Sequence, residues 1–417
     1  MGTKRERNMS IIFISCLISL FIGCFFTSSA VFAQTIKTLK VGSILPLNFG
    51  MGVDTKNMLE LLASQLNAQG GITVKGQKYS IELMIYDDKF TAEAGRAAME
   101  RLFYQDNAKF LLSTIASPTI VSGLSLVERE KVLHLTTGTT LKMINPKLRY
   151  TFSTNITLTS TAPLWFMVKR LHPSARTAVF MSPDNEGGRS RASDEKRVAE
   201  VFGVKVLDIL YYPRDAVDFT AISARAKSYN PDLVDYPGAA SGTQFGLQLK
   251  GMHAAGFRGA QVSAIGPKMD EVRAVASNDA LEGVVTRVAD TELPEPPPIA
   301  KALKNDYANK FGKWSDAGLS WSTAWQVLIG AIKKTGSVDP TTIADYIAKN
   351  GLEFQRPDGT KCRMVRRPDL NNSKYCDTLC ESTYGTIKSG AFAPVARVTI
   401  DEVIDANEKV SGGTGWR

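Results

Sequence analysis

Apolar positions in the first third of the chain alternate between short continuous runs and helical spacing. The short runs predict strands over residues 39–45, 80–86, 109–113 and 132–136. Helical spacing covers residues 91–106 and 119–129, and an earlier helix is expected to be capped by Asp54 or Thr55. Because strand and helix alternate, the pattern predicts an α/β fold with a doubly wound parallel sheet.

The same alternation begins again near residue 177. Strands are expected over residues 177–182, 204–210, 232–236 and 261–265, and helices near 187–202, 217–228 and 243–256. Two successive arrays predict two lobes of one architecture. A proline-rich break at 293–298 precedes two helical stretches, 299–311 and 317–335. From residue 353 onward we expect an irregular, basic tail.

The first 33 residues have the pattern of an export signal. Lys4, Arg5 and Arg7 precede an apolar run over residues 11–26, and a Val-Phe-Ala cleavage pattern precedes Gln34. We therefore expect a signal peptide over residues 1–33 and a soluble periplasmic protein. Two alternatives stay open. The stretch before Cys24 approximates a lipoprotein motif, and the uncharged leader is long enough to span a bilayer if it is retained.

The charge of the chain is moderately basic. Among 417 residues, 50 Lys and Arg stand against 41 Asp and Glu, a formal net charge of +9. The basic residues are dispersed apart from Arg363, Arg366 and Arg367, and an exported protein is not expected to meet nucleic acid. We therefore expect no nucleic-acid partner.

Three of the five cysteines lie beyond the leader: Cys362, Cys376 and Cys380. In an oxidising compartment two of them are expected to pair, and the sequence leaves open which two. A zinc site is the alternative, but no histidine lies nearby and a fourth ligand is missing.

Common catalytic and cofactor motifs are absent from the sequence. It contains no G-x-S-x-G elbow and no P-loop, and His134, His172 and His253 lack metal-binding spacing. The glycines at 50 and 52 lack the third glycine of a dinucleotide fingerprint. We therefore expect no enzymatic activity, no cofactor and no metal.

Hydroxyl side chains gather after two predicted strands, over residues 113–119 and 136–140. In a doubly wound sheet, ligands bind beyond the carboxyl ends of the strands, where helix N-termini and hydroxyls favour an anion. The alternative is that these residues only cap helices and close turns.

Several segments, in this order and spacing, carry a resemblance to a known family. They are residues 39–47, Asn67-Ala68-Gln69-Gly70-Gly71-Ile72, Tyr86-Asp87-Asp88, Ala116-Ser117-Pro118-Thr119, 137–140, Asp218-Phe219-Thr220-Ala221, Pro231-Asp232-Leu233-Val234, Ala255-Gly256-Phe257, Gly266-Pro267 and Glu282-Gly283-Val284. The chain resembles the periplasmic substrate-binding proteins of ABC importers, of the leucine/isoleucine/valine type.

The resemblance implies two α/β lobes joined by three crossovers, which close on a ligand like a hinged clamp. The crossovers are expected near 153–155, 285–287 and 352–356. Lobe I would comprise residues 34–153 with 287–352, and lobe II residues 154–286 with 353–417. A segment over 358–383 would be an elaboration of a lobe surface. The protein would be a monomer whose partners are a small ligand and a membrane permease.

The family's ligand-binding positions transfer residue by residue. In lobe I, Ala116 or Ser117 with Thr139 and Thr140 would hold the ligand's carboxylate, and Phe49 and Met51 would form an apolar wall. In lobe II, the positions that are often aromatic correspond to Glu186 and Ala239, which depart from the pattern. Lys268 stands where amino-acid binders carry an acidic residue for the ligand's ammonium.

Two interpretations of Lys268 follow. If it faces the cleft, it repels an ammonium and attracts an anion, which favours an organic or aromatic acid without an amino group. Otherwise it is solvated or pairs with Glu186 or Asp270, and the ligand is an amino acid. We favour the first. The alternative function is a ligand-sensing receptor of the same fold, and it requires a retained N-terminal anchor.

Overall fold

The structure, a computed structural model, describes residues 35–155, 159, 161–238, 241–263, 269–413 and 415–417. The predicted signal peptide and two predicted ligand-binding residues, Ala239 and Lys268, lie outside the described residues. The chain divides into two units, Met1–Ile36 and Lys37–Arg417, and the described helices and strands belong to the second. Along the described part of the chain, no helix is long and apolar enough to cross a membrane.

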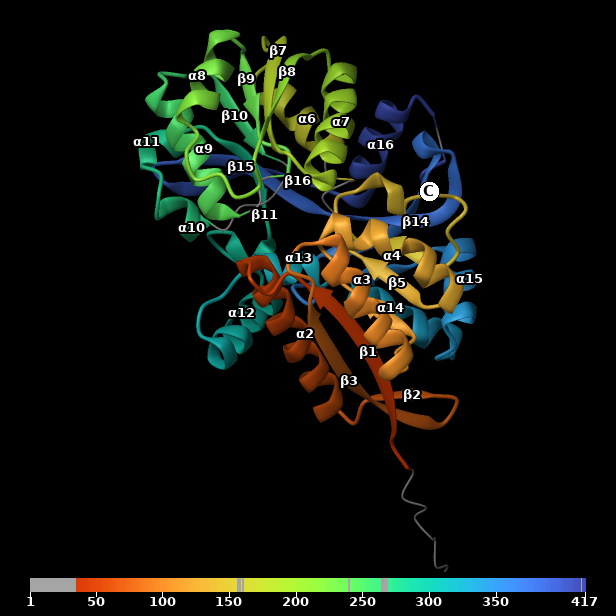
Figure 1. Ribbon diagram of the computed structural model, residues 1–417. Coiled ribbons are helices and arrows are strands. Elements are labelled where there is room, and N and C mark those ends of the chain that lie inside the picture. The colour runs from red at the N-terminus through yellow and green to blue at the C-terminus, as the bar shows by residue number, and fades with distance from the viewer. Residues whose placement is uncertain (1–34, 156–158, 160, 239–240, 264–268, 414) are drawn as a thin grey trace, which may run out of the picture. The chain divides into compact units, whose positions relative to one another are not determined.

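Lobe I is built around a six-stranded sheet (Figure 1). Its strands are β1 (Lys37–Leu45), β2 (Ile72–Val74), β3 (Gln77–Asp87), β4 (Phe110–Leu112), β5 (Leu133–Thr136) and β6 (Thr151–Ser153). They lie in the order β2-β3-β1-β4-β5-β6, and all neighbours are parallel except β2 and β3. Its first helices are α2 (Gly50–Ala68), α3 (Ala92–Glu100) with the π-helix η1 (Arg101–Gln105), α4 (Ser117–Glu130) and the 3₁₀ turn η2 (Leu141–Met143).

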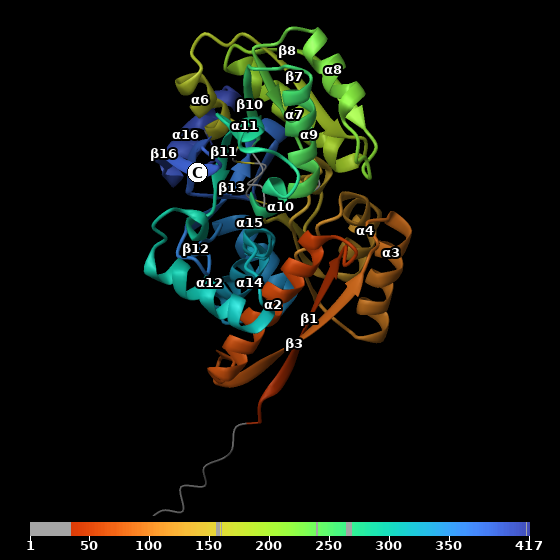
Figure 2. The ribbon, with the colours of Figure 1, turned by 90° about the vertical axis from the view of Figure 1, so that its left-hand side faces the viewer.

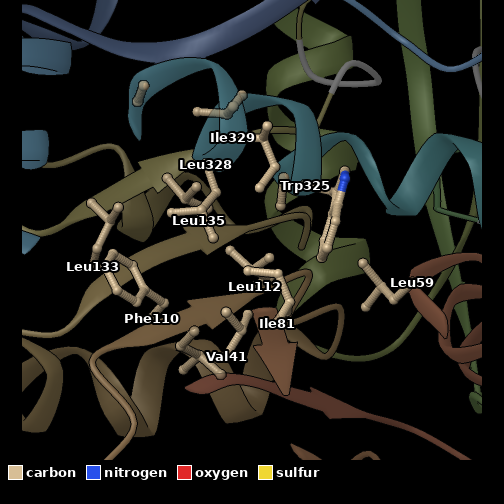
Figure 3. Close-up of a cluster of buried hydrophobic side chains, with 14 of the residues drawn as sticks. Val41, Leu59, Ile81, Phe110, Leu112, Leu133, Leu135, Trp325, Leu328 and Ile329 are labelled. Carbon is tan, nitrogen blue, oxygen red and sulfur yellow. The ribbon is translucent and has the colours of Figure 1, made fainter. Parts of the chain in front are cut away.

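A returning segment completes lobe I. It contains α12 (Pro298–Phe311), α13 (Asp316–Trp321), α14 (Thr323–Thr335) and α15 (Pro340–Asn350). Figure 2 shows α12 beside α2, and α13 also packs against α2. In the core, Val41, Leu112 and Leu135 of three strands cluster with Trp325 and Leu328 of α14 (Figure 3). Burial of each such side chain contributes about 1.5–3 kcal/mol, so this helix belongs to the lobe although it lies far along the chain.

Two helices of lobe I begin earlier than the sequence predicted. Helix α2 begins at Gly50, so Asp54 and Thr55 do not cap it but are buried within it. A side chain at Gly52 would collide with the carbonyl oxygen of Pro46. The glycine that suggested a loop instead lets the first turn of α2 pack against the end of β1. Helix α4 begins two residues before the predicted start.

Lobe II is built around a seven-stranded sheet in the order β16-β15-β11-β10-β9-β7-β8. Its strands are β7 (Thr177–Pro183), β8 (Lys205–Tyr212), β9 (Leu233–Asp235), β10 (Ala260–Ser263), β11 (Val285–Val288), β15 (Ser382–Lys388) and β16 (Ala391–Val398). Its helices are α6 (Thr161–Leu171), α7 (Glu186–Val201), α8 (Thr220–Ser228), α9 (Gly242–Ala254), α10 (Met269–Arg273), α11 (Asn278–Leu281) and α16 (Ile400–Ser411). Strands β7 to β11 are parallel, and β15 and β16 add an antiparallel edge. The prediction of two doubly wound parallel-sheet lobes is confirmed.

The prediction of an irregular tail from residue 353 is wrong. Besides β15, β16 and α16, this tail forms a three-stranded antiparallel sheet of β12 (Glu353–Gln355), β13 (Lys361–Arg367) and β14 (Asn372–Cys380), with the 3₁₀ turn η4 (Pro368–Leu370). The strand pattern is hidden in the sequence because Arg367 and Asp377 are buried as an ion pair, with 2.7 Å between Nη1 and Oδ2.

The 358–383 segment is also not a surface elaboration. Strand β14 lies beside β6, where the Thr378 hydroxyl donates to the carbonyl oxygen of Ser153 at 3.0 Å. The chain passes between the lobes after β6, between β11 and α12 through the 3₁₀ turn η3 (Asp290–Glu292), and through this small sheet. Strand β14 therefore lies against one of the passages.

The predicted cysteine pair is confirmed, and it joins Cys362 to Cys380. The two residues face each other in the register of β13 and β14. A disulfide that closes a loop of this length stabilises a fold by about 3 kcal/mol. Cys376 is free and buried, and burial raises the pKa of its thiol. Among the described residues, no cluster of His, Cys, Asp or Glu could hold a metal ion.

Candidate functional site

The N-terminus of α4 lies at the carboxyl end of β4 and carries no side-chain cap. Its N-cap residue is Ala116, which has no side-chain oxygen to accept from the first turn. Ser117 is 4% exposed, and its hydroxyl makes no hydrogen bond to any described residue. Amides in the first turn of a helix have no acceptor within the helix and carry partial positive charge. The start of α4 is therefore suited to bind a carboxylate.

The loop after β5 adds a second free hydroxyl. The hydroxyls of Thr136 and Thr137 both donate to the carbonyl oxygen of Thr114, at 2.9 and 3.4 Å, and hold the two strand ends together. The Thr140 oxygen accepts from the backbone of η2. In contrast, Thr139 forms no side-chain hydrogen bond within the part of the chain that the structure describes. Caps and turns thus account for most of these threonines but not for Thr139.

His134 lies in β5 behind this loop and is fully buried, with Nε2 3.1 Å from the Thr114 hydroxyl oxygen. Burial lowers the pKa of His134 from 6.5 to about 3. In the unfolded chain His134 is therefore protonated as the pH falls through about 6.5, whereas in the folded chain it stays neutral until the pH falls to about 3. The stability that neutral His134 contributes is present above pH 6.5 and is lost as the pH falls toward 3.

We expect His134→Gln to flatten this pH dependence. Between pH 6 and pH 4, the unfolding free energy of the wild type should fall more steeply than that of the variant, by about 1.4 kcal/mol per pH unit. Urea denaturation at several pH values measures both slopes. Equal slopes would show that His134 does not titrate on unfolding.

The first turn of α7, from lobe II, packs directly on the two free hydroxyls. A Cβ atom on Gly187 would lie 2.5 Å from Oγ1 of Thr139 and 2.8 Å from Oγ of Ser117. Glycine is therefore required here if the lobes are to approach this closely. The α7 N-terminus is itself capped, because Asn185 accepts from the amide of Gly188 at 2.9 Å.

Polar contacts tie the same turn of α7 to lobe I. Glu186 lies 3.1 Å from the Lys142 ammonium and 3.3 Å from the Thr140 hydroxyl. One turn later, Ser190 accepts from the amide of Leu141 at 2.9 Å. Because Lys142 and Glu186 are partly exposed, this ion pair stabilises the contact by only about 0.2–1 kcal/mol. These contacts hold the lobes together. They involve Thr140, Leu141 and Lys142, so the Glu186 carboxylate does not occupy the N-terminus of α4.

Phe49 of lobe I and Arg214 of lobe II both pack against the ring of Phe90. Phe49 is the N-cap of α2, and its ring packs edge-on against Phe90, with 5.5 Å between centroids. Arg214, from the loop after β8, places its guanidinium carbon 3.9 Å from the Phe90 centroid and 5.5 Å from that of Phe49. Burial lowers the pKa of Arg214 to about 10, although nearby Tyr212 acts in the opposite direction.

Two acidic residues of α10 in lobe II, Asp270 and Glu271, form a salt bridge and a hydrogen bond within the protein. Glu271 of α10 accepts from the amide of Gly242 at the start of α9, at 3.1 Å. Asp270 pairs with Lys313 of lobe I. The two acids that the sequence offered as partners for Lys268, Glu186 and Asp270, thus have other lysines beside them.

The structure brings together five of the nine predicted ligand-binding residues. Ala116, Ser117, Thr139, Thr140 and Glu186 lie where α4 and the loop after β5 meet α7. Phe49 lies nearby on Phe90. Met51 lies in the first turn of α2, and its carbonyl oxygen accepts from the Thr55 hydroxyl at 2.7 Å. Ala239 and Lys268 lie outside the described residues.

Three residues of this region escaped the sequence analysis: Phe90, Gly187 and Arg214. Arg214 follows a predicted strand of lobe II, as the hydroxyl-rich loops follow predicted strands of lobe I, so its position at a strand end was a signal. The Gly187-Gly188 pair at a helix start was a signal for close approach. No sequence motif or predicted element marked Phe90 as a candidate binding residue.

Known proteins share this fold. The family model for periplasmic binding proteins matches residues 38–367. A leucine-binding protein from Thermotoga maritima superimposes with a TM-score of 0.68 and 20% identity, covering 87% of this chain and 99% of that one. A solute-binding protein of an ABC transporter from Rhodopseudomonas palustris BisB5, in complex with 3,4-dihydroxybenzoic acid, has a TM-score of 0.68 and 19% sequence identity. The match covers 86% of this chain and 97% of that one. A solute-binding protein of an ABC transporter from R. palustris HaA2, in complex with p-hydroxybenzoic acid, has a TM-score of 0.69 and 16% sequence identity. The match covers 87% of this chain and 97% of that one. At these identities the likeness establishes the fold.

Proposed function

The chain belongs to the periplasmic binding protein family, whose members bind solutes for ABC transporters and catalyse no reaction, and on that premise we propose its ligand class. The ligand is a small carboxylate without an α-amino group, captured between the lobes and delivered to an ABC importer. Residues 1–33 direct export to the periplasm. Residues 34–153 with 287–352, and 154–286 with 353–417, act as the two lobes of a monomer.

The observation that carries this proposal is the open N-terminus of α4. Ser117 and Thr139 present hydroxyls without partners among the described residues, beside helix amides that the N-cap leaves unsatisfied. A bound carboxylate would accept hydrogen bonds from these hydroxyls and from the amides of the first turn. The first turn of α7 then covers the site from lobe II.

The absence of an amino group is supported by the charges around the site. A ligand ammonium needs a carboxylate, yet Glu186, Asp270 and Glu271 already contact other groups. Arg214 adds a cation, and Lys268 would add another if it faces the cleft. Proteins of this fold bind 3,4-dihydroxybenzoic acid and p-hydroxybenzoic acid, which are amino-free aromatic acids.

A thermal-shift screen tests the ligand class directly. Benzoate, hydroxybenzoates and aliphatic acids would be compared with leucine, valine and glutamate at equal concentrations. A ligand present at 100 times its Kd stabilises the folded state by about 2.7 kcal/mol, which raises Tm measurably. We expect stabilisation by an amino-free acid. Stabilisation by amino acids alone would overturn the proposal.

Ser117→Ala tests the carboxylate site. Removing one hydrogen bond to a charged group costs about 1.5 kcal/mol, so we expect roughly 10-fold weaker binding of the acid found in the screen. Ser125→Ala, at an exposed position on the same helix, is the matched control and should leave the Kd unchanged. Isothermal titration calorimetry measures both. Equal affinity of the Ser117 variant and the wild type would place the carboxylate elsewhere.

A further inference from the structure

Arg214 differs from the buried arginines Arg191, Arg356 and Arg367, each of which has an acidic partner in the structure. The guanidinium of Arg367 bonds to Asp369 and Asp377, and that of Arg356 lies 2.7 Å from Asp358. Within the described ranges, no carboxylate lies within ion-pair distance of Arg214, and its buried Nε lacks a hydrogen bond. Leaving a buried charge without a partner is costly, so a partner supplied by another molecule would be favourable.

The position of Arg214 is fixed by backbone and ring contacts. Its carbonyl oxygen accepts from the side-chain amide of Gln244 at 3.0 Å, which ties the loop to the first turn of α9. Its guanidinium lies over the ring of Phe90. A planar guanidinium stacked in this way keeps its in-plane N–H groups available, and their fork geometry matches a carboxylate.

The aromatic platform under Arg214 is connected to the start of α4. Asp88 accepts from the amide of Phe90 at 2.9 Å and from the hydroxyl of Thr119, in the first turn of α4, at 2.8 Å. Through Phe90 and Asp88, Arg214 of lobe II is therefore linked to the helix of lobe I that begins at Ser117. Phe49 and Phe90 form an apolar wall beside Arg214.

We infer that the ligand carries two acidic groups, one bound at the start of α4 and the other by Arg214. This inference rests on the proposed function and narrows it. The ligand is an amino-free dicarboxylate whose flat apolar body lies against Phe49 and Phe90. Arg214 is then the residue that distinguishes dicarboxylates from monocarboxylates, and the second carboxylate of the ligand is its acidic partner.

The test compares two probes, benzoate and benzene-1,4-dicarboxylate, by isothermal titration calorimetry. The wild type should bind the dicarboxylate at least about 10-fold more tightly than benzoate, because one probe engages Arg214 and the other does not. In Arg214→Gln this preference should disappear. The ratio of the two Kd values is the readout, because any loss of contact between the lobes affects both probes equally.

Arg189→Gln is the matched control. Arg189 also lies over an aromatic ring, that of Tyr211 at 4.5 Å, but it is exposed and paired with Asp184 at 2.6 Å. Its variant should keep the wild-type ratio. Retained benzoate binding by Arg214→Gln shows that this variant is folded.

Two outcomes overturn the inference and leave the proposed function standing. One is a wild type that binds benzoate as tightly as the dicarboxylate. The other is an Arg214→Gln variant that keeps the preference, which would make Arg214 only a contact between the lobes. A wild type that binds neither acid but binds an amino acid overturns the proposed function itself.

Discussion

Gly187→Leu is expected to weaken ligand binding by about 5- to 150-fold while leaving the unliganded protein as stable as the wild type. The three atoms closest to a Cβ at this position belong to Ser117 and Thr139, across the lobe interface. Overpacking a well-fitted contact costs about 1–3 kcal/mol, which corresponds to this range of affinity. We expect the added side chain to oppose closure rather than folding, because the nearest contacts of its Cβ lie across the lobe interface.

The neighbouring glycine provides the control. A Cβ at Gly188 would collide with the carbonyl oxygen of Pro183, which lies in the same lobe. Gly188→Ala should therefore lower the Tm of the unliganded protein, whereas Gly187→Leu should not. Calorimetry with the acid found in the screen, together with thermal denaturation without ligand, separates the two effects. If Gly187→Leu binds as tightly as the wild type, the ligand does not require this approach of the lobes.

Arg367→Met is expected to lower the unfolding free energy by about 3–5 kcal/mol, because it leaves the buried carboxylate of Asp377 without its cation. Arg367 is 1% exposed and bonds to Asp377 at 2.7 Å and to Asp369 at 2.8 Å. Its guanidinium also lies 5.0 Å from the ring of Trp416, near the C-terminus. The residue therefore joins β13, β14 and the last residues of the chain.

Arg363→Met, in the same strand, is the control. Arg363 pairs with the exposed Glu353, and loss of such a surface pair costs about 0.2–1 kcal/mol. Urea denaturation measures both variants. The double variant Arg367→Met/Asp377→Leu should recover part of the loss, since it removes both charges of one pair. A loss below 1 kcal/mol in Arg367→Met would show that the buried network contributes little to stability.

Local patterns predicted four parallel strands in each sheet, because each of these strands and its following helix carry their own periodicity, whereas β6 and β11 were not predicted. Strands β1, β3, β4 and β5 and their counterparts in lobe II lie within a few residues of the expected ranges. Strands β13 and β14 were missed because their buried ion pairs replace the apolar alternation that marks a strand. The starts of α2 and α4 were misplaced because packing against the strand ends, rather than a capping residue, decides them.

The sequence by itself determined the fold class, the family, the two loops where hydroxyls gather, and the export signal that we propose. These follow from neighbours along the chain, since the carboxyl ends of parallel strands meet at one edge whatever the details of packing. Only the tertiary structure decided which hydroxyls are free, which cysteines pair, and that Gly187, Phe90 and Arg214 lie against predicted ligand-binding residues. The disulfide depends on the register of β13 and β14, and the other facts depend on packing between elements that are distant in sequence, which no local pattern encodes.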